Sequence, residues 1–341
     1  MAALAVLVVA LTFVGGYRLP RNTLPVRAPS GTAGRAAAAA PIRPPLLLSL
    51  RLAARPVGGK RQLRAAPPAV PRIDAGRLTR ALDRRLAGWP GRITATVADL
   101  ATGRTFRYRR GERMITASTV KVEILMGLLL TTPWRGLDAE LRRMADAMIR
   151  ASDNRATDRL WEQLGYAAGL NRVSWALGLR HTGAVDGICV DLYCWGVVRT
   201  TADDQVRLMR LLAAGGGPLA PADRAVVLAL MRRVVPGQRW GVSAGACPGD
   251  TVAVKNGWMR RVHNRLWVID TVGLITGRGH RYAVAVLSEG SRTMSEGVAR
   301  VEQVTRTIMA AFRGARGCGT AGGPSRARGG PRRSPVVSST G

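Results

Sequence analysis

The chain has 341 residues, of which 47% are hydrophobic, and this is enough for one sizeable folded core with tails. The formal net charge of +31 is typical of nucleic-acid binding, but residues 1–72 and 314–341 hold 16 of the 52 basic residues and no acid. Aromatic residues make up only 5%, too few for a base-stacking surface. We therefore expect no nucleic-acid partner, and association with an anionic cell envelope only through the basic tails.

The first 16 residues are apolar and carry no charged side chain. This length is typical of a signal peptide or a short anchor and is too short for a comfortable membrane span. Arg18 and Arg21 follow the segment, whereas the basic residues of a usual signal peptide precede it. We expect a secreted or extracytoplasmic protein, either released or held at the membrane through residues 1–16.

Residues 17–72 are rich in Ala, Pro, Gly and Arg and are expected to form a linker. Hydrophobic periodicity then predicts an alternation of helices and strands over residues 73–313. The predicted elements are a helix at 74–86, strands at 93–100 and 104–108, helices at 118–130, 137–150, 158–164, 170–177 and 203–212, strands at 252–255, 266–275 and 282–288, and a helix at 296–312.

This order predicts an antiparallel sheet assembled from both ends of the domain, with the helical block inserted between them. The first and last helices would cover one face of the sheet. Residues 314–341 are rich in Gly, Pro, Ser and Arg and are expected to form a disordered basic tail.

Only three of the 52 basic residues are lysine: Lys60, Lys121 and Lys255. Arginine stays protonated under ordinary conditions, whereas a buried lysine can lose its proton and act as a base. Lys60 lies in the linker, but Lys121 ends the sequence Ser118-Thr-Val-Lys and Lys255 begins Lys255-Asn-Gly. A chain that uses arginine almost everywhere has kept lysine at two positions where we expect chemistry.

Ser118 and Lys121 are three residues apart at a predicted helix start, so their side chains lie on one face. A serine hydroxyl needs a neighbouring base before it can act as a nucleophile. The apolar residues around Lys121 predict a buried amine with a lowered pKa, and the helix N-terminus can stabilise an oxyanion. This pair is a candidate nucleophile and base.

A third motif, Ser152-Asp153-Asn154, lies between the other two. Together and in this order, the three motifs resemble those of the class A β-lactamases and penicillin-binding proteins. The resemblance spans residues 74–312 and implies an α+β, β-lactamase-like fold. Such a fold has a five-stranded antiparallel sheet flanked by helices, with an inserted all-helical lobe and the site between lobe and sheet.

The resemblance also implies roles for individual residues. Ser118 would be the nucleophile and Lys121 its base, while Ser152 would pass a proton to the leaving nitrogen and Lys255 would attract the substrate carboxylate. Asp153 is usually structural in this pattern. The implied substrate-binding residues are Asn154 for the amide, Asn256 and Gly257 on the third motif, Trp258 with Ser118 for the oxyanion, and Arg265 (or Arg260 or Arg261) for the carboxylate.

Two departures from the family pattern concern turnover. The loop at 182–200 contains no glutamate of the kind that holds the deacylating water in class A enzymes, and only Asp186 or Asp191 could replace it. Asn256 stands where Thr or Ser is usual, which removes a hydroxyl for the carboxylate. Both changes leave acylation intact but remove the recognised route to fast deacylation.

A competing nucleophile is Ser243 in Gly241-Val-Ser-Ala-Gly245, which matches the Gly-x-Ser-x-Gly elbow. That elbow needs a preceding strand, a following helix and a later histidine. Pro236-Gly237 precedes the segment and Cys247-Pro-Gly follows it, so the context does not favour an elbow.

The four cysteines permit three complete pairings. Cys189 and Cys194 are close enough to clamp a loop, which would fit an oxidising compartment; buried free thiols are the alternative. No metal-ligand spacing joins the cysteines to His181, His263 and His280.

We therefore expect a serine hydrolase, without metal or organic cofactor, that opens the amide of a β-lactam through an acyl-Ser118 intermediate. The alternatives are a D-alanyl peptidase acting on a peptidoglycan peptide and a non-catalytic envelope or ligand-binding protein on the same fold.

Overall fold

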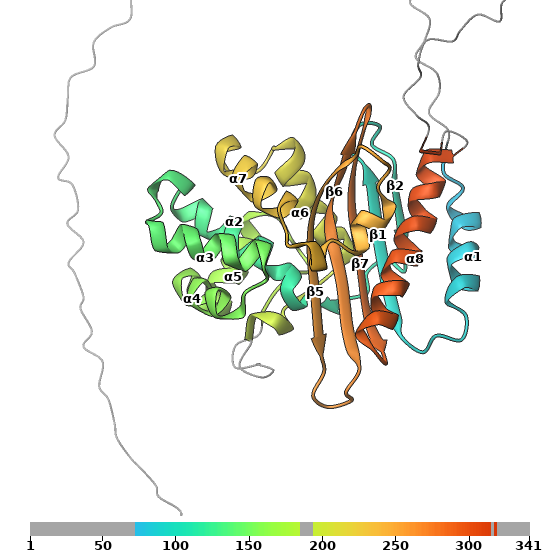
Figure 1. Cartoon of the computed structure of the whole chain (residues 1–341), viewed down its shortest axis with the longest axis horizontal. Helices are drawn as coiled ribbons and strands as arrows, with labels where there is room; N and C mark the ends of the chain where they lie inside the picture. The colour runs from blue at the N-terminus through green and yellow to red at the C-terminus, as the bar shows by residue number, and fades with distance from the viewer. Residues whose placement is uncertain (1–71, 185–193, 315–316, 319–341) are drawn as a thin grey trace, which may run out of the picture. The chain divides into compact units, whose positions relative to one another are not determined.

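The computed structural model describes residues 72–184, 194–314 and 317–318 (Figure 1). A five-stranded antiparallel sheet has the order β2-β1-β7-β6-β5. Its strands are β1 (Arg92–Asp99), β2 (Thr105–Tyr108), β5 (Thr251–Arg260), β6 (Trp267–Gly277) and β7 (His280–Ser291). Since β1 lies beside β7, the two ends of the domain meet inside one sheet, and the predicted α+β architecture is confirmed.

One face of the sheet is covered by α1 (Ala75–Leu86) and α8 (Met294–Arg313), as Figure 1 shows. The amphipathic period of α1 buries Leu78, Leu82 and Leu86. Asp74 caps the helix by accepting a hydrogen bond from the Arg77 backbone N–H. The prediction that the first and last helices share a face is confirmed.

The opposite face carries the helical lobe (Figure 1). Its members are α2 (Lys121–Thr131), α3 (Ala139–Arg150), α4 (Asn154–Leu164), α5 (Tyr166–Ala176), α6 (Ala202–Ala214) and α7 (Pro221–Arg232). Helix α2 lies at the centre of the lobe and is buried from Lys121 through Leu129, because it is apolar on almost every side.

Short elements connect the lobe to the sheet. Strand β3 (Met114–Ile115) pairs with β4 (Arg199–Thr200), and the 3-10 helix η1 (Ala117–Val120) follows β3. The predicted helix at 118–130 is therefore wrong in its first turn, which is 3-10 before α2 begins. The remaining 3-10 helices in the described part are η2 (Trp134–Gly136), η3 (Cys194–Val197), η4 (Pro236–Gln238) and η5 (Gly241–Gly245).

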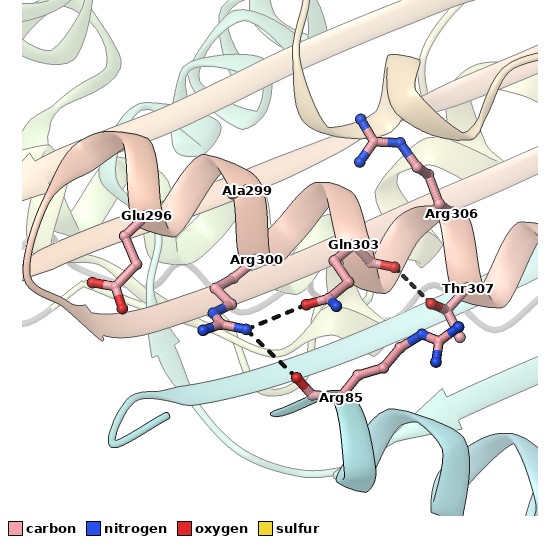
Figure 2. A pocket seen from close by; sticks show the side chains of 7 residues that line it. All are labelled: Arg85, Glu296, Ala299, Arg300, Gln303, Arg306 and Thr307. Atoms are coloured by element: carbon pink, nitrogen blue, oxygen red, sulfur yellow. Dashed lines mark hydrogen bonds between the residues drawn. The ribbon is translucent and has the colours of Figure 1, made fainter. Parts of the chain in front are cut away.

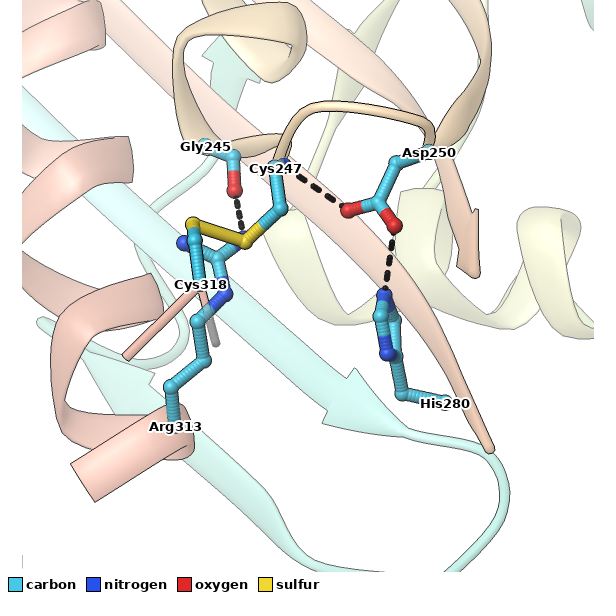
Figure 3. Close-up of a disulfide and its surroundings, with 6 residues drawn as sticks. All are labelled: Gly245, Cys247, Asp250, His280, Arg313 and Cys318. Atoms are coloured by element: carbon cyan, nitrogen blue, oxygen red, sulfur yellow. Dashed lines mark hydrogen bonds and ion pairs between the residues drawn. A yellow bond between two sulfur atoms is a disulfide. The ribbon is translucent and has the colours of Figure 1, made fainter. Parts of the chain in front are cut away.

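A disulfide joins Cys247 to Cys318 (Figure 3), and Cys194 is also disulfide-bonded, so the free-thiol alternative is wrong for these three. Cys189 lies outside the described residues. The bond holds residue 318 to the domain, beyond the boundary predicted at 313. None of the helices in the described ranges has the length and apolar character needed to cross a bilayer.

Candidate active site

The candidate nucleophile lies on a constrained turn. Ser118 sits on η1, and the preceding Ala117 has a φ of 41°, a left-handed conformation that non-glycine residues rarely adopt. Hydrogen bonds stabilise the turn: the Thr116 N–H donates to the Val198 carbonyl, and Thr119 donates to the Thr116 carbonyl. Strained backbone of this kind is concentrated at functional sites. Ser118 retains 7% exposure.

Lys121 is fully buried one turn beyond the serine. Its Nζ donates to the Ser152 carbonyl at 2.7 Å, to Ser152 Oγ at 3.2 Å and to Asn154 Oδ1 at 2.8 Å. No hydrogen bond among the described residues joins this Nζ to Ser118 Oγ. Catalytic hydrogen bonds often form only when substrate is bound, so this geometry is compatible with a role as base.

Burial lowers the pKa of Lys121 to about 7, although the nearby carboxylates of Asp153 and Asp158 raise it. A buried ammonium loses its hydration, which favours the neutral amine. At neutral pH a large share of Lys121 is therefore deprotonated, as a general base requires.

Ser152 links the two lysines. It has a φ of 58°, and its Oγ accepts a hydrogen bond from Lys255 Nζ at 2.9 Å as well as from Lys121. Burial, followed by the positive charge of Lys121, lowers the pKa of Lys255 well below its ordinary value. One hydroxyl thus lies between two buried amines, a path along which a proton can move between them.

Asp153 and Asn154, which follow Ser152, make different hydrogen bonds. Asp153 caps α4 by accepting a hydrogen bond from the Ala156 backbone N–H at 2.7 Å, in agreement with a structural role. Asn154 begins α4 and directs its Oδ1 at Lys121. The Asn154 side chain is therefore in the predicted cluster with Ser152 and Lys121.

Gly257 brings β5 against the nucleophile turn. A Cβ at this position would lie 2.7 Å from the Thr116 carbonyl oxygen and 2.9 Å from the Ser118 backbone nitrogen. Only glycine permits this approach. The next residue, Trp258, is on the same strand. Its ring packs edge-on against the ring of Trp240, and the two ring centroids are 6.2 Å apart. The predicted oxyanion residues, Ser118 and Trp258, are thus on facing segments of backbone.

Asn256 and Arg265, two of the predicted substrate-binding residues, do not direct their side chains at Ser152 as the two lysines do. The Asn256 Nδ2 donates to the carbonyls of Gln238 and Trp240, so this buried side chain fixes the segment before η5. Arg265 is exposed on the β5–β6 hairpin, with a φ of 60°. Its carbonyl accepts a hydrogen bond from Arg260 Nε.

Arg261, the other alternative for the carboxylate anchor, forms an ion pair with Glu289 at 3.2 Å. Glu289 also accepts a hydrogen bond from the Ile115 backbone N–H, next to the nucleophile turn. Of the three arginines, Arg261 is therefore the one connected to the backbone that leads into η1.

Sequence reasoning missed Trp195 and Asp158. The Trp195 ring lies over Lys121 Nζ, which is 4.5 Å from the ring centroid, and Trp195 Nε1 donates to Asp158 Oδ1 at 2.7 Å. The only sequence signal was a large aromatic residue in the loop before the Thr200-Thr201 helix start. Asp186 and Asp191, the candidates to replace the family glutamate, lie outside the described residues.

Two other regions do not bring together catalytic groups. Ser243 lies in η5, which packs against α8, and no hydrogen bond in the described part joins it to a histidine. A cavity of about 560 Å³ lies along α1 and α8 (Figure 2). Its lining consists of Arg85, Glu296, Ala299, Arg300, Gln303, Arg306 and Thr307, with no motif residue among them. We therefore place the site at the serine–lysine cluster.

Within residues 72–184, 194–314 and 317–318, no group of three or more His, Cys, Asp or Glu side chains could hold a metal ion.

A sequence model of the β-lactamase enzyme family matches residues 130–312. The chain belongs to this family, within the superfamily of β-lactamase-like serine hydrolases. The match begins after Lys121 and includes the motifs that start at Ser152 and Lys255. The "Putative lipoprotein LppW" of Mycobacterium tuberculosis is 30% identical over 255 residues, which cover 71% of this chain and 78% of the relative.

Solved structures share the fold. The structure of PBP-A has a TM-score of 0.61 at 23% identity, and covers 72% of this chain and 99% of its own. A class A β-lactamase from Mycobacterium abscessus has a TM-score of 0.58 at 21% identity, with coverage of 70% and 99%. The TLA-1 extended-spectrum β-lactamase has a TM-score of 0.62 at 14% identity, with coverage of 70% and 99%.

Proposed function

We propose that the protein is a serine hydrolase that opens the amide of β-lactams through an acyl-Ser118 intermediate. One observation carries this proposal: Lys121 and Lys255, both fully buried, converge on Ser152 Oγ beside the strained turn that bears Ser118. Burying two amines is costly unless the site uses them, and a lowered pKa supplies the neutral base that a serine nucleophile needs.

The proposed acylation has two proton transfers. Neutral Lys121 accepts the proton of Ser118 as the Ser118 Oγ forms a bond to the lactam carbonyl carbon. The carbonyl oxygen becomes negative and is stabilised by the backbone N–H groups of Ser118 and Trp258. The carbon–nitrogen bond then breaks while Ser152 donates its proton to the nitrogen. Ser152 is reprotonated by one of the two lysines to which it is hydrogen-bonded.

The test is intact-mass spectrometry of the full chain over time after addition of benzylpenicillin. We expect a mass gain of one penicillin molecule, because ring opening releases no fragment. The Ser118→Ala variant should show no gain, since it lacks the nucleophile. A wild-type chain that gains no mass at any time would overturn the proposal for β-lactams.

A D-alanyl peptidase acting on peptidoglycan would use the same acylation on a peptide. One observation favours it as the second candidate: within the described ranges, no carboxylate forms an ion pair or a hydrogen bond with Lys121 Nζ. Release of D-alanine from a D-Ala-D-Ala peptide, lost in Ser118→Ala, would support this activity. The name of the LppW relative supports an extracytoplasmic location, where such substrates occur.

A further inference from the structure

Hydrolysis of an acyl-serine ester needs a water molecule near the acyl carbon and a base to take its proton. Among the described residues Lys121 is the candidate base next to Ser118, and its surroundings decide whether water can reach it. The amine is 0% exposed and already has three protein acceptors, two atoms of Ser152 and one of Asn154. These three protein atoms occupy the side of the amine that faces Ser152 and Asn154, so no water is needed there to complete its hydrogen bonds.

Trp195 covers a second side of the amine. The centroid of its ring is 4.5 Å from Lys121 Nζ, and the residue is only 3% exposed. Its Nε1 donates to Asp158 Oδ1 at 2.7 Å, so one oxygen of this carboxylate is engaged by the indole. The indole therefore contacts both Lys121 and Asp158.

Trp195 is also fixed relative to the nucleophile. It belongs to η3, which leads directly into β4, and β4 pairs with β3 just before the nucleophile turn. The Val198 carbonyl accepts the Thr116 N–H in the same connection. Since the indole is anchored at both the backbone and the Nε1 atom, it cannot move aside without breaking these contacts.

We propose that Trp195 is a positioning residue that keeps water away from Lys121, so that the acyl-Ser118 ester persists. This inference rests on the proposed acylation of Ser118 and adds the fate of the ester.

The test is the lifetime of the penicilloyl adduct in full-length Trp195→Ala. Removal of the indole leaves a space bounded by Lys121 Nζ and Asp158 Oδ1, and a polar space of this size takes up water. That water oxygen would bond to the acyl carbon, the bond to Ser118 Oγ would break, and the proton of the water would pass through the base to Ser118 Oγ. We expect the adduct to decay at least ten times faster than in the wild-type chain.

A second readout separates this role from simple packing. Hydration of Lys121 in Trp195→Ala favours the ammonium form and raises its pKa. The pH at which the acylation rate reaches half of its maximum should therefore increase. Trp195→Phe keeps a ring over the amine and should retain the long-lived adduct. Trp175→Ala is the matched control, because Trp175 is 85% exposed on α5 and should leave both readouts unchanged.

Trp195→Leu tests the same inference with a smaller cavity, should the alanine variant fold poorly, and is expected to shorten the adduct lifetime as well. Adding Asp158→Asn to either variant should remove most of the gain if Asp158 activates the water. An unchanged adduct lifetime in folded Trp195→Ala or Trp195→Leu overturns the inference, as does a wild-type adduct that decays within seconds. Absence of any wild-type adduct instead overturns the acylation proposal itself.

Discussion

At the scale of single residues, lysine is used in this protein where a proton must leave. Lys121 and Lys255 are each 0% exposed and each donate to Ser152 Oγ, whereas the described arginines are mostly at the surface. A guanidinium keeps its proton under all ordinary conditions, so arginine at either position would place a permanent positive charge beside this hydroxyl. The scarcity of lysine in the sequence was therefore a correct indicator of a buried cluster.

The pKa of Lys121 predicts the pH dependence of acylation. Because the pKa is lowered to about 7 and the neutral amine is the base, the acylation rate should rise as pH increases through about 7. Below this limb the rate should fall about tenfold per pH unit. The measurement is the rate of adduct formation with a chromogenic β-lactam between pH 5 and 9.

Two variants check the assignment. Lys121→Arg should abolish acylation at every pH, because the guanidinium cannot become neutral in this range. His280→Gln should keep the limb, since His280 is the histidine hydrogen-bonded to Asp250 and contacts no motif residue. If the acylation rate of His280→Gln no longer depended on pH, the histidine would account for the pH dependence, and the role of Lys121 would be contradicted.

At the scale of elements, α2 holds a second buried group, Glu123, against α5. Ser174 Oγ donates to Glu123 Oε1 at 2.5 Å, and Glu123 Oε2 has no partner among the described residues. Burial raises the pKa of Glu123 to about 8, although the hydrogen bond from Ser174 lowers it. The carboxyl is therefore protonated at neutral pH, and the helix pair carries no buried charge.

This raised pKa makes stability fall as pH rises. Between pH 4.5 and about 8 the folded state binds one proton more than the unfolded state. The contribution of Glu123 to the free energy of unfolding is therefore fully present below pH 4.5, and it is lost as the pH rises through about 8. The loss should be on the order of a few kcal/mol. Urea unfolding of Glu123→Gln across pH 4–9 should lack this slope, because the amide does not ionise.

The matched control is Glu162→Gln on α4, whose side chain is 54% exposed and faces Arg159 at 3.4 Å. Its unfolding curve should keep the wild-type dependence on pH. An identical slope in Glu123→Gln and the wild-type chain would show that Glu123 does not titrate in this range.

Sequence periodicity predicted every strand of the main sheet and most helices, but it did not predict α7. Pro221 at the first helical position was a valid start signal, yet the following Val-Val-Leu-Ala-Leu-Met run shows no clear polar face. Periodicity is weak there because the helix is in contact with several elements of the lobe and with β5. The strand β5 extends over Thr251–Arg260, longer than predicted, since the polar Lys255-Asn-Gly motif interrupts its apolar pattern.

The sequence predicted only those residues of the candidate site that belong to short contiguous motifs. Ser118, Lys121, Ser152 and Lys255 were found because each motif is contiguous in the sequence. Trp195 was not found, because it is marked only by its contact with Lys121 across the fold. Contacts between residues 74 positions apart leave no local pattern, and a buried tryptophan resembles any other core residue in sequence.

At the scale of the whole molecule, the Cys247–Cys318 bond closes a segment of 71 residues that includes three strands and α8. Cross-linking removes entropy from the unfolded chain, and a loop of this length should contribute about 4 kcal/mol. The double variant Cys247→Ser/Cys318→Ser should therefore unfold at a lower urea concentration than the wild-type chain under non-reducing conditions.

The control is the wild-type chain carried through the same unfolding at two protein concentrations, which excludes intermolecular disulfides. An unchanged urea midpoint in the double variant would contradict a stabilising role. Asp250 lies beside this bond, accepting the Cys247 N–H at 2.8 Å and pairing with His280 at 3.0 Å (Figure 3), so part of the local structure should survive the substitution.

The pairing of β1 with β7 has a consequence for the order in which the molecule is built. Arg92 lies opposite Glu289 in that pair, so the sheet cannot close until nearly the whole domain has left the ribosome. The helical lobe is made mostly of nearby segments, and local contacts form faster than distant ones. Lys255 lies 103 residues after Ser152, so the second amine joins the two serines only after the whole helical lobe has been synthesised.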